Sequence, residues 1–136
     1  MFRRIEEKKA TLTSDKLPSL LVYKAPVRQV FQNLISNALK YTTKNMPVEI
    51  HISVSELKSY WQFSITDNGI GIEEEHLHRI FDMFFRATMQ SEGAGLGLYI
   101  LKETIEKIEG KINVSSKIGE GVSFMINLPN LPVPGN

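Results

Sequence analysis

Two runs of alternating hydrophobic residues limit the possible folds more than any other feature of this chain. Hydrophobic side chains stand at every second position of residues 48–54 and again of residues 61–65, with polar side chains between them. A period of two is typical of strands that bury one face and leave the other in water. Because only a short segment around residues 56–59 separates the runs, we expect an antiparallel hairpin whose hydrophobic face needs a second layer to cover it.

Helical periodicity supplies that second layer. Hydrophobic residues recur at intervals of three and four from Val27 to Tyr41, after a proline at position 26 that suits a first helical turn. The pattern predicts an α+β fold, in which a mostly antiparallel sheet carries helices on one face. The other predicted elements are helices at 73–81 and 95–109, the second of them ended by Gly110 in the left-handed conformation, and strands at 20–23, 111–116 and 122–128, the last two joined by a turn at 119–121.

Composition removes several classes of function. Hydrophobic residues make up 42% of the 136 residues, which is enough for one compact domain with its own core. The absence of cysteine excludes disulfides and thiol nucleophiles, and a net charge of +1 gives no reason to expect nucleic acid or an anionic membrane as a partner. No hydrophobic run approaches the ~18 residues of a membrane span. The three histidines, His51, His76 and His78, lack metal-binding spacing, and we interpret them as solvated.

Three polar residues share one face of the first predicted helix. Asn33, Asn37 and Lys40 stand at positions i, i+4 and i+7. Carboxamide oxygens are acceptable Mg²⁺ ligands when phosphates supply the other oxygens, and a lysine one turn further along can neutralise phosphate charge. The same spacing also describes the solvated face of an ordinary amphipathic helix, and for this helix alone that is the more common case.

Asp67 ends the second alternating run and falls in phase with its hydrophobic residues. It is followed by Asn68-Gly69-Ile70-Gly71. A carboxylate on a buried face is costly unless it is hydrogen-bonded, and one suitable partner is an exocyclic amine such as the N6 amine of adenine. Gly69 and Gly71 allow a tight turn and a close approach of the backbone to a flat ligand. The alternative is a plain turn, since Asp-Asn-Gly is a common turn sequence.

Gly93, Gly95 and Gly97 come just before the third predicted helix. Glycines at a helix N-terminus can form an anion cradle from backbone N–H groups, and the polar loop 87–94 is typical of a mobile lid, although a plain linker has the same composition. Phe81 belongs to an aromatic cluster of the kind found in protein cores. Arg86 follows that cluster and, at the start of the loop, can reach a terminal phosphate with two hydrogen bonds.

These residues fall into four motifs that together resemble a known family. In chain order the motifs cover residues 33–41, 67–72, 80–86 and 93–98. The arrangement resembles the catalytic and ATP-binding domain of bacterial sensor histidine kinases, within the larger family that includes DNA gyrase, mismatch-repair and heat-shock chaperone ATPases. The resemblance covers roughly residues 17–129. It implies a two-layer α/β sandwich in which a mixed sheet of about five strands backs three helices, with Mg-ATP bound between the helices and the lid.

The resemblance also implies roles for individual residues. Asn37 is expected to bind Mg²⁺ with help from Asn33, and Lys40 and Arg86 to contact phosphate. Tyr41 is expected to pack over the base, and Asp67 to accept a hydrogen bond from the amine of adenine. The remaining nucleotide-binding residues implied by the motifs are Gly69, Gly71, Ile72, Phe81, Gly93, Gly95, Leu96, Gly97 and Leu98.

One position separates the branches of this family. Hydrolytic members resemble one another in carrying a glutamate one helical turn before the Mg²⁺ asparagine, where this chain has Asn33. An amide cannot act as a general base at neutral pH, so the resemblance implies a kinase and not a water-directed ATPase. The alternatives are a nucleotide-sensing binding module without phosphotransfer and a gyrase-type ATPase.

The kinase interpretation implies partners outside this chain. No histidine here has the setting of a phosphoacceptor, so we expect the acceptor on a separate dimerisation domain of the same kinase and a response regulator downstream. We expect residues 1–16 to form the end of a connecting segment and a first strand, residues 17–129 the catalytic domain, and residues 130–136 a disordered tail. A cytoplasmic location is expected, without direct membrane contact by this domain.

Overall fold

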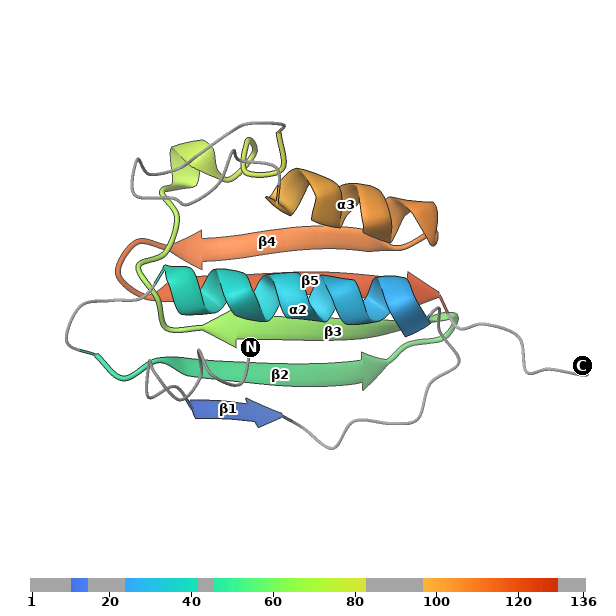
Figure 1. Ribbon diagram of the computed structural model, residues 1–136, viewed down its shortest axis with the longest axis horizontal. Coiled ribbons are helices and arrows are strands. Elements are labelled where there is room, and N and C mark those ends of the chain that lie inside the picture. The colour runs from blue at the N-terminus through green and yellow to red at the C-terminus, as the bar shows by residue number, and fades with distance from the viewer. Residues whose placement is uncertain (1–10, 15–23, 42–45, 83–96, 130–136) are drawn as a thin grey trace, which may run out of the picture.

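The computed structural model describes residues 11–14, 24–41, 46–82 and 97–129, and within them it contains one mixed sheet. The strand order is β1-β2-β3-β5-β4 (Figure 1). Only the pair β1–β2 is parallel, and the other three pairs are antiparallel. The mixed, mostly antiparallel sheet is therefore confirmed. The strands are β1 (Thr11–Ser14), β2 (Glu49–Glu56), β3 (Tyr60–Asp67), β4 (Lys111–Lys117) and β5 (Gly121–Pro129).

The predicted hairpin is formed by β2 and β3. Ile52 is the register partner of Ile65, and Val54 is the partner of Phe63, so the hydrophobic positions of the two runs lie on one face. The turn at 119–121 joins β4 to β5, as predicted. The strand predicted at 20–23 lies outside the described residues.

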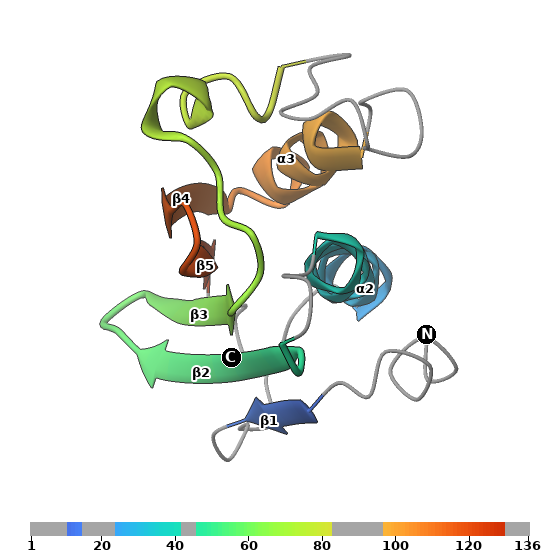
Figure 2. The ribbon, with the colours of Figure 1, turned by 90° about the vertical axis from the view of Figure 1, so that its left-hand side faces the viewer.

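Two α-helices cover the hydrophobic face of the sheet in the part of the chain that the structure describes. They are α2 (Lys24–Lys40) and α3 (Gly97–Lys107), and both lie on the same side of the sheet (Figure 2). The edge of the Phe31 ring meets the Phe63 ring at a centroid distance of 5.3 Å, which ties α2 to β3. The helices of the described residues include none with both the length and the hydropathy of a membrane span. The buried core includes Val30, Leu34, Leu39, Ile50, Ile65, Leu101, Ile105, Phe124 and Ile126.

The prediction of a helix at 73–81 is wrong. The structure has one 3₁₀ turn, η1 (Glu74–His76), followed by further turns closed by i to i−3 hydrogen bonds such as Arg79 N–H to the His76 carbonyl at 2.9 Å. Three consecutive glutamates begin the segment, and Glu73, with no side-chain cap bond, leaves the first N–H groups uncapped. Only Ile80 is buried, so the segment lacks the hydrophobic stripe that would stabilise a full helix.

The predicted helix at 95–109 is confirmed as α3, which ends at Lys107, and the left-handed residue after it lies one position earlier than predicted. Glu109, and not Gly110, adopts the left-handed conformation, with φ of 63°. Gly110 follows it and donates its N–H to the Ile105 carbonyl at 2.9 Å. A Cβ on Gly110 would lie 2.7 Å from the Asn127 carbonyl oxygen, so glycine is needed here for space and not for its torsion angle.

Because a left-handed non-glycine residue is strained, Glu109→Gly should stabilise the domain. We expect the free energy of unfolding to rise by about 0.5–1 kcal/mol, measured by chemical denaturation. Glu103→Gly is the matched control, since the exposed Glu103 lies inside α3, where glycine should cost about 1 kcal/mol. Equal effects of the two substitutions would contradict the assignment of the strained position.

Candidate functional site

The end of α2, the end of β3 and the turn between β4 and β5 lie at the same end of the sheet (Figure 1). Between them runs the glycine loop, which we define as Asp67–Ile72. The Ile70 N–H donates to the Tyr41 carbonyl at 3.0 Å, and the Gly119 N–H donates to the Ile70 carbonyl at 2.8 Å. The glycine loop is therefore fixed on one side to the end of α2 and on the other to the β4–β5 turn.

Asp67 stands at the start of the glycine loop and is half-buried. Its Oδ1 accepts hydrogen bonds from the Gly69 N–H at 2.8 Å and from the Val122 N–H at 3.3 Å. Burial raises the pKa of this carboxyl above its ordinary value, and the two backbone hydrogen bonds partly oppose that rise. Within the described residues no donor meets Oδ2, so this second oxygen can accept a hydrogen bond from a ligand.

Both glycines of the loop lie against protein backbone. A Cβ on Gly69 would collide with the Tyr41 carbonyl oxygen, and a Cβ on Gly71 would collide with the Lys117 carbonyl oxygen. Gly71 also has a φ of 78°, which side chains rarely allow. The close approaches that the structure shows are thus to Tyr41, just after α2, and to β4, and contact of these glycines with a base stays a prediction.

The polar face of α2 leads directly to the glycine loop. Asn33 and Asn37 are half-buried, and Lys40 is exposed. The Tyr41 N–H donates to the Asn37 carbonyl at 3.3 Å, and the Tyr41 carbonyl in turn accepts the hydrogen bond from Ile70. Asn37 therefore lies one helical turn from the loop, and within the described part of the chain neither asparagine amide has a hydrogen-bond partner.

Two residues that the sequence reasoning missed hold the loop in place. The Asn68 side chain accepts the Glu49 N–H at 2.8 Å and donates to the Pro47 carbonyl at 2.8 Å, so it joins the loop to the start of β2. The Ser116 hydroxyl accepts the Ile72 N–H at 2.7 Å and donates to the Gly121 carbonyl at 2.7 Å. Asn68 lies inside the motif at 67–72, which was an available signal, whereas Ser116 has no signal in the sequence.

The other predicted site residues are only partly placed. Phe81 packs edge-to-face on Phe124 at 6.3 Å, under the Lys102 ammonium at 5.7 Å, so part of its ring contributes to the core. Ile72 and Leu98 pack against the same core, and Gly97 is the exposed first residue of α3. Arg86, Gly93, Gly95 and Leu96 lie outside the described residues, as do the predicted lid and the tail at 130–136.

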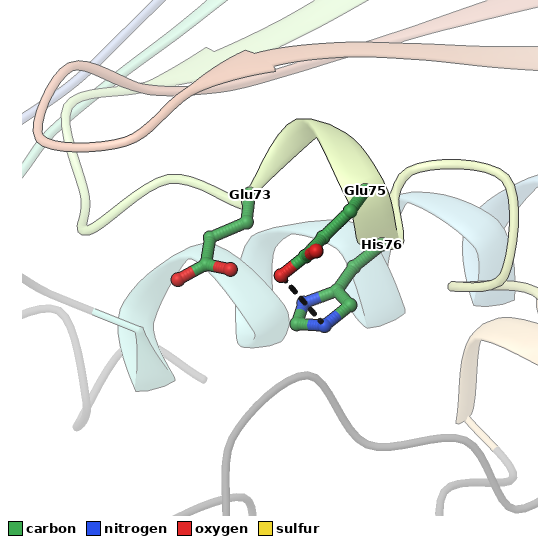
Figure 3. Close-up of side chains that lie close together, drawn as sticks. All are labelled: Glu73, Glu75 and His76. Atoms are coloured by element: carbon green, nitrogen blue, oxygen red, sulfur yellow. Dashed lines mark ion pairs between the residues drawn. The ribbon is translucent and has the colours of Figure 1, made fainter.

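Around η1 the described residues bring three potential metal ligands together. Glu73, Glu75 and His76 have ligand atoms within 4.8 Å of one another (Figure 3). The Glu75 carboxylate raises the pKa of the Glu73 carboxyl through a hydrogen bond and its negative charge, and it lies 3.8 Å from His76 Nε2. Both glutamates are exposed on one short turn. The cluster contains none of the residues predicted to bind Mg²⁺, so it gives that prediction no support.

The other two predicted solvated histidines are exposed, but one of them has a defined contact. His51 Nδ1 lies 2.6 Å from the Thr13 hydroxyl, across the parallel pair β1–β2. His78 is exposed next to η1. Neither of these two residues belongs to the group around Glu73.

Comparisons with a family model, with sequences and with solved structures point to the same family. The model of the family described as histidine kinase-, DNA gyrase B-, and HSP90-like ATPase matches residues 23–132. Cyanobacterial phytochrome A from Nostoc sp. (strain PCC 7120) is 42% identical over 129 residues, which are 93% of this chain and 17% of that protein. Sensor protein kinase WalK from Staphylococcus aureus is 42% identical over 105 residues, which are 74% of this chain and 25% of that protein.

A solved structure described as full-length ShkA in complex with AMPPNP has the same fold. Its TM-score is 0.80 at 26% sequence identity, and the match covers 97% of this chain and 28% of that one. The chain therefore spans less than a third of the length of each of these three proteins.

Proposed function

The chain belongs to the family of histidine kinase-, DNA gyrase B-, and HSP90-like ATPases, and from this membership we propose that it binds Mg-ATP and delivers the γ-phosphoryl group to a histidine on a separate domain. The observation that carries the proposal is the half-buried Asp67, whose Oδ1 is held by two backbone N–H groups while Oδ2 remains available to a ligand. The description of the ShkA structure as a complex with AMPPNP supports a nucleotide site in this fold.

In the proposed complex, the glycine loop and the end of α2 hold the base. Asp67 Oδ2 accepts a hydrogen bond from the exocyclic amine of adenine, and the Tyr41 ring packs on the base. Gly69, Gly71 and Ile72 form the floor, which their close packing on α2 and β4 keeps rigid. A rigid acceptor favours adenine over guanine, because guanine presents a carbonyl where adenine presents an amine. Phe81 closes the site from the end of the following segment.

The phosphates belong, in this proposal, on the polar face of α2. The half-buried Asn37 and Asn33 fit a Mg²⁺ ion, since the two residues lie one helical turn apart on α2 and their amides have no hydrogen-bond partner within the described residues. Such an ion supplies charge neutralisation to the phosphates. Lys40 adds a positive charge one turn further along. The other proposed phosphate and lid residues are Arg86, Gly93, Gly95, Leu96, Gly97 and Leu98.

The proposed reaction is transfer to a histidine and not to water, because the site has an asparagine, Asn33, where a general base would be needed. A bond forms between an imidazole nitrogen of the acceptor and the γ-phosphorus, while the bond from that phosphorus to the bridging oxygen breaks and ADP leaves. Asn33 cannot take a proton from water, so hydrolysis is slow. The chain's own residues position the phosphates and stabilise their charge, which is most of what phosphoryl transfer needs.

The proposed partners follow from the same reaction. The acceptor lies on the histidine-bearing dimerisation domain of the same kinase, and the phosphoryl group passes from there to a response regulator. We propose a cytoplasmic location and a catalytic unit that extends from about residue 17 to residue 129. The relative named as a sensor protein kinase supports partners of this kind.

Incubation with γ-labelled ATP tests the proposed reaction. The domain alone should bind ATP, release labelled phosphate slowly and carry no label on His51, His76 or His78. Addition of a cognate histidine-bearing dimerisation domain should transfer the label to that domain, and an acceptor with its histidine replaced by alanine is the control. Fast hydrolysis by the lone domain would favour the gyrase-type ATPase, and ATP binding without transfer would favour the nucleotide-sensing module.

A further inference from the structure

Ser116 joins two segments that both shape the nucleotide site. It is the half-buried penultimate residue of β4, and its hydroxyl is used twice. The Ile72 N–H donates to Ser116 Oγ at 2.7 Å, and the same hydroxyl donates to the Gly121 carbonyl at 2.7 Å. One side chain thus connects the end of the glycine loop with the start of β5.

The start of β5 fixes the orientation of Asp67. The Val122 N–H donates to Asp67 Oδ1, and the Gly121 backbone packs so closely on the Asp67 carbonyl oxygen that a Cβ would not fit between them. A shift of Gly121 therefore moves the N–H group that orients the carboxylate. The bond from Ser116 to the Gly121 carbonyl helps to hold that position, together with the pairing of β4 and β5.

The end of the glycine loop depends on the same hydroxyl. Ile70 is held by backbone bonds to Tyr41 and Gly119, but the bond that holds the Ile72 N–H comes from Ser116. Without the hydroxyl, the N–H of the half-buried Ile72 and the carbonyl of the buried Gly121 would each lose this partner, which costs more than the net value of one hydrogen bond. We propose that Ser116 is a positioning residue for the nucleotide site, which sets the adenine floor and the Asp67 carboxylate in one geometry.

This inference rests on the proposed function, and base selectivity is the readout that separates it from a purely structural role. Calorimetry with ATP and with GTP should show that Ser116→Ala binds ATP about fivefold to tenfold more weakly, in keeping with the loss of about one hydrogen bond. GTP binding should change less, so the ratio of the two affinities should fall. Ser116→Thr keeps the hydroxyl and should keep the ratio.

Ser115→Ala is the matched control. Ser115 precedes Ser116 on β4, is exposed, and points to the opposite face of the sheet, so its loss should leave both affinities unchanged. Amide hydrogen exchange provides a second measurement that needs no nucleotide. The Ile72 amide should exchange faster in Ser116→Ala than in the wild type or in Ser115→Ala.

The outcomes distinguish the inference from the proposed function. If the wild-type domain selects ATP, and Ser116→Ala lowers the melting temperature but leaves the ATP-to-GTP ratio unchanged, Ser116 is only structural and the inference is wrong. Unchanged exchange at Ile72 would also overturn it. If the wild-type domain binds no ATP, the proposed function fails, and the positioning role fails with it.

Discussion

Asp67→Asn should lower the affinity of the domain for ATP by about 100-fold, which is the expected cost of losing a hydrogen bond to a charged acceptor. The amide oxygen of asparagine can replace Oδ1 and keep the bonds from Gly69 and Val122, so the fold should survive. The amide NH₂ then takes the place of Oδ2 and faces the adenine amine, donor against donor. Calorimetry measures the loss. The control is Glu56→Gln, at an exposed carboxylate that pairs with Trp61 at the far end of the β2–β3 hairpin from Asp67, and it should bind ATP as the wild type does.

The same substitution should reduce the preference of the domain for ATP over GTP. In the proposed complex, the wild-type carboxylate would accept a hydrogen bond from the amine of adenine and repel the carbonyl of guanine, whereas the asparagine NH₂ can donate to that carbonyl. The wild type should therefore prefer ATP strongly, and the variant should bind GTP better relative to ATP. Similar affinities for ATP and GTP in the wild type would remove Asp67 from the base site.

The pKa of Asp67 gives this binding a pH dependence. Burial raises that pKa, so the carboxyl takes up a proton at a higher pH than an exposed aspartate would. The protonated form is a poor acceptor for the adenine amine, and ATP affinity should fall as the pH falls through the raised pKa. The stability of the domain without ATP should change in the opposite direction, and rise as the pH falls. Ionisation of a buried carboxyl costs stability, so the contribution of Asp67 to the free energy of unfolding should increase over the same fall in pH.

Periodic segments of the fold could be predicted from the sequence, because their hydrophobic spacing reflects burial directly. The hairpin β2–β3 and the helices α2 and α3 each show a sustained period of two or of three to four. The segment 73–81 contains apolar residues at intervals that also fit a helix, yet only Ile80 is buried there. Spacing alone cannot show how few of an element's apolar residues are buried.

The candidate site was predictable where a motif lies on a periodic element. Asp67 was assigned to the inner face by its phase with Phe63 and Ile65, and it is half-buried on that face. Ser116 could not be predicted in this way. Its importance depends on the register that sets it opposite Val122 and beside Ile72, which is a long-range property of the sheet.

The turn between β4 and β5 contains two glycines with positive φ but different surroundings. Gly119 has a φ of 82° and nothing within 4 Å of the place where a Cβ would lie. Gly121 has a φ of 116°, and its Cβ would collide with the Asp67 carbonyl oxygen. An alanine would therefore have a strained torsion angle at both positions, but its Cβ would collide with backbone only at Gly121.

Gly121→Ala should consequently destabilise the domain far more than Gly119→Ala. We expect Gly119→Ala to cost about 1 kcal/mol from its torsion angle alone, and Gly121→Ala to cost about 3 kcal/mol or more, since the Asp67 backbone must move. At roughly 4 °C per kcal/mol for a domain of this size, the melting temperatures should fall by about 4 °C and about 12 °C. Thermal unfolding followed by circular dichroism measures both. Equal losses would mean that β5 does not press against Asp67, and the carboxylate would then lack the fixed orientation on which the proposed adenine selection depends.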